Sequence, residues 1–230
     1  MRALNAFIKK ILSTQGYALY QPSKGIPWPL SYHNINRLFY FKEMMDYISN
    51  VKGDIVECGV GQGESLIMLA SLVKKELKGR NIWGFDSFEG FPQPGKEDKS
   101  IRNAREGEWG DTSVYIVRNS LINAGLDDEF IESQINLVKG FFEKSLSKYT
   151  GSSIALLHLD VDLYKSYLTA LNKLYPKVTK GGVILFDEYI GTIDHLHFPG
   201  AQKAINEFFK DNKSLLSRHP LTGKYYFIKK

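Results

Sequence analysis

The stretch DIVECGVGQGES, residues 54–65, ends a short apolar run in three closely spaced glycines, and a helical pattern follows at once. Glycine permits the positive φ of a tight turn and lets a ligand approach the backbone closely. We therefore expect a strand, a ligand-binding turn and a helix in this order. Such a unit builds an open parallel sheet, in which ligands lie at the carboxyl ends of the strands.

Outward from this unit, apolar strands alternate with helical segments along the chain. Further strands are expected at residues 81–86, 134–140, 153–160 and 181–189, each separated from the next by a helical pattern. This alternation predicts an α/β fold, a doubly wound and mostly parallel sheet with helices on both faces. The tail has the composition of a hairpin with a turn at Thr222 and Gly223, so it is expected to add one antiparallel strand at the C-terminus.

The chain is expected to form one domain, residues 35–230, preceded by an N-terminal helix and lid segment at residues 1–34. The stretch MRALNAFIKKILSTQG has apolar residues at helical spacing, but its lysines interrupt what would be a signal-peptide core. We expect an amphipathic helix that packs on the body or on a second copy of the chain. The polar segment at residues 87–110 is longer than an ordinary connection, which indicates a substrate lid or a disordered segment.

Size, composition and charge exclude several classes of protein. A chain of 230 residues with 43% hydrophobic residues fits one globular domain. The net charge of +5 comes from lysines spread over the helices, so no nucleic-acid partner is predicted. No stretch reaches the roughly 20 apolar residues that cross a bilayer, so no stable membrane insertion is expected. The single cysteine, Cys58, excludes an internal disulfide. We expect a cytoplasmic protein and a homo-oligomer.

The glycine turn favours S-adenosylmethionine over a dinucleotide. Its Gly-x-Gly-x-Gly spacing differs from the dinucleotide pattern, and Glu64 opens the following helix where a pyrophosphate would lie. S-adenosylmethionine has no phosphate and carries cationic groups, which Glu57 could meet. Asp86 ends the next strand, where an acid can accept hydrogen bonds from ribose hydroxyls. A nicotinamide nucleotide would use the same acid, so Asp86 alone does not discriminate between the two.

Two later strands end in paired acids. LHLDVDLY, residues 157–164, contains Asp160 and Asp162, and ILFDEY, residues 184–189, contains Asp187 and Glu188. Carboxylates gathered at one sheet edge repel one another, and hard oxygen ligands suit magnesium, calcium or manganese. A divalent metal is therefore expected. In the alternative interpretation, Asp162 caps the following helix and Glu188 faces solvent.

Three histidines could take part in the chemistry. His195 and His197 lie in the loop GTIDHLHF beside the acidic strand ends, so either could act as a general base, although simple exposure on the loop is equally compatible. His158 stands within an apolar strand, which favours a core histidine with a satisfied hydrogen bond over a metal ligand.

The segments ECGVGQGES, FDSFEGFP, LHLDVDLYKS, GGVILFDEY and FPGAQKAINEF follow the order and the approximate spacing of the macrocin O-methyltransferase family, which the chain resembles over about residues 30–215. That family comprises magnesium-dependent and S-adenosylmethionine-dependent enzymes that methylate sugar hydroxyls on macrolides, aminocoumarins and related glycosides. The resemblance implies a Rossmann-like class I methyltransferase domain, S-adenosyl-L-methionine and Mg²⁺ as cofactors, and a small-molecule glycoside or a nucleotide sugar as acceptor.

The resemblance also implies roles for matching residues. Asp160, Asp187 and Glu188 would hold the metal, and Asp160 would lie close to the methyl group. Asp160, His195 and His197 are the candidates for the general base. The cofactor would be held by Glu57, Gly59, Val60, Gly61, Gly63, Ser65, Asp86, Ser87, Phe88, Gly140, Phe141 and Asp160. The chain departs from the family pattern at Glu188, where Asp is usual, in Val60-Gly61-Gln62-Gly63, where an aromatic-basic pair is more common, and at Gln202, where Arg is common.

The expected reaction is an in-line methyl transfer to a sugar hydroxyl. A metal-dependent methyltransferase of a catechol-type phenol would use the same acids, because a catechol and a vicinal diol present similar oxygen pairs. Alternatives of other classes are a nicotinamide-dependent sugar-nucleotide enzyme and a binding module without catalysis. The scattered basic charge disfavours an RNA methyltransferase.

Overall fold

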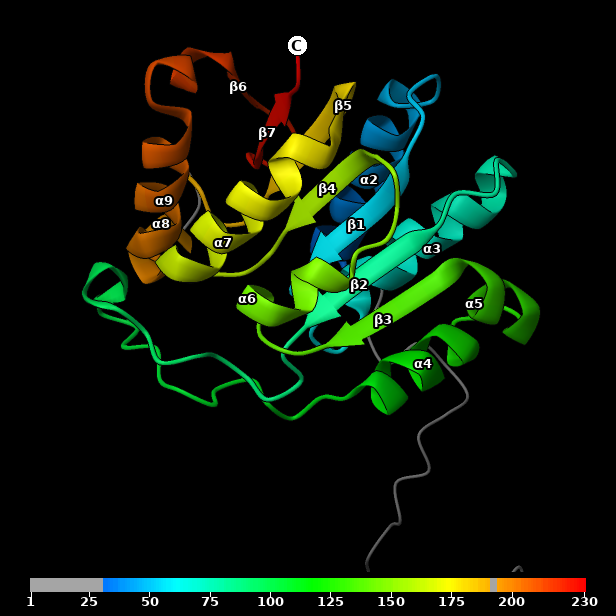
Figure 1. Ribbon diagram of the computed structural model, residues 1–230, viewed down its shortest axis with the longest axis horizontal. Coiled ribbons are helices and arrows are strands. Elements are labelled where there is room, and N and C mark those ends of the chain that lie inside the picture. The colour runs from blue at the N-terminus through cyan, green and yellow to red at the C-terminus, as the bar shows by residue number, and fades with distance from the viewer. Residues whose placement is uncertain (1–30, 191–193) are drawn as a thin grey trace, which may run out of the picture.

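The computed structural model describes residues 31–190 and 194–230 (Figure 1). Its described residues contain a seven-stranded sheet with the order β3-β2-β1-β4-β5-β7-β6. The strands are β1 (Asp54–Cys58), β2 (Ile82–Asp86), β3 (Ile135–Lys139), β4 (Ile154–Leu159), β5 (Val178–Phe186), β6 (Leu216–Arg218) and β7 (Tyr225–Ile228). The first five are parallel to one another, whereas β7 pairs antiparallel with β5 and β6 pairs antiparallel with β7.

Helices cover both faces of the sheet, as Figure 1 shows with α7 and α9 in front and α2 and α3 behind. The front face carries α6 (Phe142–Ser145), α7 (Tyr164–Leu174) and α9 (Pro199–Phe209). The rear face carries α2 (Tyr32–Tyr47), α3 (Glu64–Glu76), α4 (Val114–Asn123) and α5 (Asp128–Gln134). The short α8 (Asp194–His197) precedes α9, and 3-10 turns lie at Lys96–Asp98, Leu146–Lys148, Tyr175–Lys177 and Lys210–Leu215.

The side chains of the central strands alternate between two cores. On β1, Val56 and Cys58 belong to the front core, which packs on α7 and α9, whereas Ile55 belongs to the rear core, which packs on α2 and α3. On β4 all six residues are buried. A strand that is covered on both faces is nearly continuously apolar in sequence, which is why β4 shows no alternation of polar and apolar residues.

The expected fold class is confirmed, with three local differences. The tail contributes two antiparallel strands to the sheet instead of one, because β6 also pairs with β7. The helix α5, with Asp127 as its N-cap, was not expected from the sequence. The helix α2 begins at Tyr32, three residues before the expected start of the domain at residue 35, because the Ser31 side chain accepts a hydrogen bond from the amide of Asn34. The expected N-terminal helix lies outside the described residues.

The long segment at residues 87–110 packs against the starts of α7 and α9. Asp98 is buried, and its carboxylate accepts hydrogen bonds from the amides of Gly95 and Tyr164, both at 2.8 Å. The Ser100 hydroxyl donates to the carbonyl of His197 at 2.6 Å. A Cβ on Gly200 would lie 1.9 Å from Asp98 Oδ1, so only glycine lets α9 approach this carboxylate. The segment is thus fixed by a buried acid.

Within residues 31–190 and 194–230, we find no helix with the length and apolar character that a membrane span requires.

Candidate functional site

A cleft of about 420 Å³ lies at the carboxyl ends of the parallel strands. The turn after β1, the end of β2 and the end of β4 form its floor. The segment 87–112, the start of α6 and Arg37 from α2 form its walls. Its position is the one expected for the ligand site of an open parallel sheet.

The glycine turn and Asp86 form one half of this cleft. Asp86 accepts hydrogen bonds from the amide of Gly61 at 2.9 Å and from the amide of Phe88 at 2.7 Å. Burial raises the pKa of Asp86, although these amide hydrogen bonds oppose the shift. A Cβ on Gly59 would lie 1.6 Å from the carbonyl oxygen of Asp160, so this glycine lets the turn pack directly on the end of β4. The carboxylate of Asp86 is therefore held in one orientation by the backbone.

A second segment completes this half of the cleft. The Thr112 hydroxyl donates to the carbonyl of Gly61 at 2.5 Å, and the Gln62 amide donates to Asp111 at 3.3 Å. Both Asp111 and Thr112 line the cleft just before α4. Reasoning from the sequence missed them, because they belong to a polar segment without periodicity and meet the glycine turn only through the topology.

Most of the predicted cofactor residues line the cleft. These are Gly59, Val60, Gly61, Ser65, Asp86, Ser87, Phe141 and Asp160. Four others lie behind its wall and support it. Gly63, with φ of 93°, packs against Val117. Phe88 is buried, the Gly140 amide donates to the carbonyl of Asp86 at 2.9 Å, and Glu57 lies within the sheet.

Glu57 and His158 form a buried pair beneath the floor. Glu57 is fully buried, and its Oε1 atom lies 2.8 Å from His158 Nδ1. Among the described residues, Glu57 Oε2 has no hydrogen-bond partner. Burial lowers the pKa of His158, but hydrogen bonds with Asp187 and Glu57 outweigh it and raise this pKa to about 9. The expected core histidine with a hydrogen-bond partner is confirmed.

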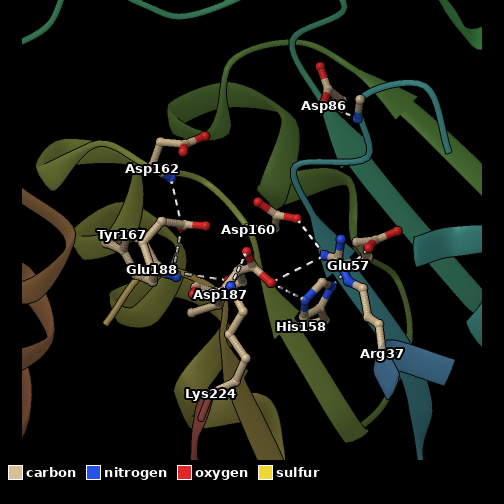
Figure 2. Close-up of polar contacts among 12 residues, drawn as sticks. Arg37, Glu57, Asp86, His158, Asp160, Asp162, Tyr167, Asp187, Glu188 and Lys224 are labelled. Atoms are coloured by element: carbon tan, nitrogen blue, oxygen red, sulfur yellow. Dashed lines mark hydrogen bonds and ion pairs between the residues drawn. The ribbon is translucent and has the colours of Figure 1, made fainter. Parts of the chain in front are cut away.

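Asp160 and Asp187 form the other half of the site with two cations (Figure 2). Arg37 Nη2 donates to Asp160 Oδ2 at 2.9 Å and to Asp187 Oδ1 at 3.2 Å. Lys224 Nζ donates to Asp187 Oδ2 and to its carbonyl, both at 2.8 Å. Ligand atoms of His158, Asp160 and Asp187 lie within 4.8 Å of one another, the spacing of a candidate metal site.

The two carboxylates differ in their electrostatics. Burial and the charge of Asp187 raise the pKa of Asp160. Burial acts in the same direction on Asp187, but Arg37, His158 and Lys224 outweigh it and hold the pKa of Asp187 well below its ordinary range. The two shifts run in opposite directions, so a proton taken up by the pair would go to Asp160 first.

Glu188 points away from these acids. Its Oε2 atom accepts hydrogen bonds from the amide of Asp162 at 3.1 Å and from the hydroxyl of Tyr167 at 2.9 Å (Figure 2). Burial and the neighbouring Asp162 charge raise the pKa of Glu188 well above its ordinary value. The interpretation in which Glu188 faces solvent is wrong, since the residue is 3% exposed. The structure groups His158, and not Glu188, with Asp160 and Asp187.

Strand alternation explains this grouping. On β5, Val183 and Leu185 belong to the rear core, whereas Ile184 and Phe186 belong to the front core. Because successive side chains point to opposite faces, Asp187 continues the rear series toward α2, and Glu188 continues the front series toward α7. A similar count along β1 and β4 places Glu57, His158 and Asp160 on the rear side. This alternation is visible in the sequence, so the grouping could have been predicted from it.

The two loop histidines are placed differently from the acids. His197 is half-buried at the end of α8 and does not line the cleft. The side chain of His195 lies outside the described part of the structure. Of the candidate bases whose side chains the structure describes, Asp160 lines the cleft and His197 does not.

An aromatic cluster forms the outer rim. The Arg102 guanidinium carbon lies 4.6 Å from the ring centre of Trp109 and 4.8 Å from that of Phe198, and Phe91 packs on Trp109 at 4.9 Å. Arg102 also makes a two-pronged ion pair with Glu108 at 2.9 and 3.0 Å. Phe91, Glu108 and Trp109 line the cleft, so this cluster forms part of its wall.

Comparisons with known proteins agree with this geometry. The family model for macrocin-O-methyltransferase (TylF) matches residues 9–220. A demethyldecarbamoylnovobiocin O-methyltransferase from Streptomyces niveus is 30% identical over 196 residues, which cover 81% of this chain and 71% of that protein. An 8-demethyl-8-(2,3-dimethoxy-alpha-L-rhamnosyl)-tetracenomycin-C 4'-O-methyltransferase from Streptomyces olivaceus is 29% identical over 173 residues, covering 72% of this chain and 66% of that protein.

The same relationship holds in three dimensions. The structure of the O-methyltransferase NovP is 25% identical in sequence and superposes with a TM-score of 0.69, covering 99% of this chain and 98% of NovP. The family match extends over most of the chain and includes the glycine turn and both acidic strand ends. The resemblance seen in the sequence is confirmed: the chain belongs to the macrocin O-methyltransferase family and is an S-adenosylmethionine-dependent O-methyltransferase.

Proposed function

We propose that this O-methyltransferase transfers the methyl group of S-adenosylmethionine to a hydroxyl of a sugar or of a glycosylated small molecule, with Mg²⁺ as a second cofactor. One observation carries the proposal: the Asp86-anchored glycine turn and Asp160, which Arg37 joins to Asp187, line the same cleft. A methyl donor held at the first and an acceptor oxygen held at the second would be neighbours.

Asp86 is the main candidate for binding the nucleoside. The amides of Gly61 and Phe88 hold its two oxygens, and each carboxylate oxygen can accept a further hydrogen bond. Two ribose hydroxyls are donors of the right kind. The glycine turn offers exposed backbone to the methionine part, since a Cβ on Gly61 would meet nothing within 4 Å.

The donor set fits Mg²⁺. Proteins often hold this ion through one or two carboxylates together with substrate oxygens and water, and Asp160 and Asp187 provide two carboxylates. His158 has a pKa of about 9, so it is protonated at neutral pH and supports Asp187 as a cation, not as a ligand. Glu188, next to Asp187 in the chain, would have to leave Tyr167 to join them. Bound Mg²⁺ would supply charge that lowers the pKa of an acceptor hydroxyl.

Asp160 would accept the proton of the acceptor hydroxyl. It lines the cleft, and its carbonyl packs on Gly59, so its carboxylate would lie between a methyl donor held at the glycine turn and Asp187. Burial and the charge of Asp187 raise the pKa of Asp160 in the protein without metal, which is the direction that favours a general base. Phe91 and Trp109 at the rim would shield the reacting groups from water. His195 and His197 stay alternatives as the base.

A sugar acceptor is supported by the relatives and by the rim. The name of the Streptomyces olivaceus relative describes a substrate that carries a rhamnosyl group. Trp109, half exposed at the cleft, offers a flat apolar surface of the kind on which sugar rings stack. A catechol could stack in the same way, so the acceptor screen must contain both glycosides and catechols.

The first test is calorimetric titration of S-adenosylhomocysteine into the full chain, with and without Mg²⁺. Micromolar binding that falls in Asp86→Ala but not in Asp128→Ala, an exposed acid on α5, supports the nucleoside site. Methyl transfer is then measured over nucleotide sugars, glycosides and catechols. Full activity of Asp187→Asn in the presence of EDTA would show that the metal part of the proposal is wrong.

A homo-oligomer and a cytoplasmic location stay predictions. Sedimentation of the full chain tests the first. Microscopy of a tagged chain in its host tests the second.

A further inference from the structure

Arg37 occupies the position between the two candidate metal carboxylates. It lies on α2, outside the strand ends that build the rest of the site, and a single nitrogen of its guanidinium reaches both Asp160 and Asp187 (Figure 2). Its side chain is 17% exposed and lines the cleft. A cation that bridged the same two carboxylates would compete with this nitrogen for their oxygens.

The charges at this place are balanced by the chain itself. Asp160 and Asp187 carry two negative charges, and Arg37 and Lys224 carry two positive charges. A divalent cation added to this balanced set would leave a surplus of two positive charges in a largely buried place, where like charges repel strongly. One of the resident cations therefore has to move.

The contacts show which cation moves more easily. Lys224 holds Asp187 from the β7 side and also bonds to its main-chain carbonyl, which a metal would leave unchanged. Arg37 touches both carboxylates from the cleft side, and its long side chain borders open space. Among the described residues, Arg37 is the cation that bridges the two acids.

We propose that Arg37 is a built-in counter-ion that competes with the divalent cation for Asp160 and Asp187, and that metal loading releases its guanidinium into the cleft. The proposal rests on the proposed function, because it concerns the same metal site. If the proposal holds, Arg37 sets the affinity for the metal. In the protein without metal, ion pairs with Arg37 hold Asp160 and Asp187.

The test measures Mn²⁺ binding to the full chain from the electron paramagnetic resonance signal of free Mn²⁺. Arg37→Gln should bind Mn²⁺ at least about tenfold more tightly than the wild type, because it keeps the two carboxylates and loses their competitor. The matched control is Lys42→Gln, which removes one positive charge from an exposed position on the same helix. It should bind within about twofold of the wild type, because exposed charges are screened.

Equal or weaker Mn²⁺ binding by Arg37→Gln would overturn the proposal, and so would the absence of binding to both proteins. S-adenosylhomocysteine is titrated into the same samples. If its binding persists while the Mn²⁺ result is negative, the counter-ion proposal fails and the methyltransferase site stands. If its binding is also lost in the wild type, the proposed function itself fails.

A measurement on the wild type covers the case in which Arg37→Gln does not fold. The side-chain Nε–H signals of arginine are followed by NMR during a Mg²⁺ titration. The signal that is absent in Arg37→Lys is assigned to Arg37, and we expect it to move as Mg²⁺ binds. An Arg37 signal that stays in place while Mg²⁺ binds would overturn the proposal.

Discussion

The two halves of the cleft are built in different ways. The cofactor half is held by backbone amides, since Gly61 and Phe88, in the turns after the neighbouring strands β1 and β2, fix Asp86. The acid half is held by side-chain charges from α2, β4, the end of β5 and the residue before β7, with Arg37 and Lys224 on Asp187. The first half is a rigid cradle of short-range contacts. The second is a balance of charges, which responds to protons, cations and single substitutions.

The largest effect should come from neutralising the acid half. Asp160→Asn keeps the shape of the side chain but removes the candidate base, so we expect methyl transfer to fall by about 10²- to 10⁴-fold. Binding of S-adenosylhomocysteine should change by less than about fivefold, because that ligand carries no sulfonium charge for the acid to meet. Single-turnover kinetics and calorimetry measure the two quantities. Activity within tenfold of the wild type would assign the base elsewhere, and His195→Ala and His197→Ala would then be compared.

The cofactor half should show the opposite pattern. Asp86→Ala removes two expected charge-assisted hydrogen bonds to ribose, so S-adenosylhomocysteine affinity should fall by about 10- to 100-fold. The rate of the bound complex should change much less, because Asp86 does not touch the reacting oxygen. Titration and saturating-substrate rates separate these effects. If Asp86→Ala lowered the rate and left the affinity intact, the division of the cleft into two halves would be wrong.

The sequence predicted that the glycine turn and Asp86 would meet at one edge of the sheet, which the structure confirms. The glycines of the turn and Asp86 stand at the ends of adjacent strands, and the topology of a parallel sheet brings such ends together. Asp160 and Asp187 were found for the same reason. Arg37 and Lys224 could not be found, because each reaches the acids from an element remote in sequence and no local pattern marks it.

The position of Glu188 could have been predicted from the alternation of side chains along its strand. Residues 187 and 188 were expected to act together, although successive residues of a strand point to opposite faces. Asp187 follows Val183 and Leu185 toward α2, and Glu188 follows Ile184 and Phe186 toward α7. The placement of Asp98 against Gly200 has no such signal, since it joins a loop to a distant helix.

That loop anchor lies outside both halves and gives a smaller effect. Gly200→Ala would place a Cβ 1.9 Å from Asp98 Oδ1, so we expect a loss of about 1–3 kcal/mol in the free energy of unfolding from overpacking. Urea unfolding measures it. In the background of Asp98→Ala the same substitution should cost less, since Oδ1 is gone and the Cβ of Tyr164, at 3.0 Å, is the remaining close contact. Equal losses in both backgrounds would show that the contact does not limit this position.

The smallest effect tests the charge balance through pH. His158 has a folded pKa of about 9 and an ordinary value of 6.5, so its interactions stabilise the fold fully below pH 6.5, and that contribution is lost as the pH rises through 9. The free energy of unfolding should therefore fall by at least about 1 kcal/mol more over this range in the wild type than in His158→Asn, which cannot gain a proton. Urea unfolding at several pH values measures the difference. Parallel curves for the two proteins would mean that His158 is neutral in the fold. It would then be free to act as a third ligand beside Asp160 and Asp187, and the acid half would resemble a preformed metal site more than a balance of ion pairs.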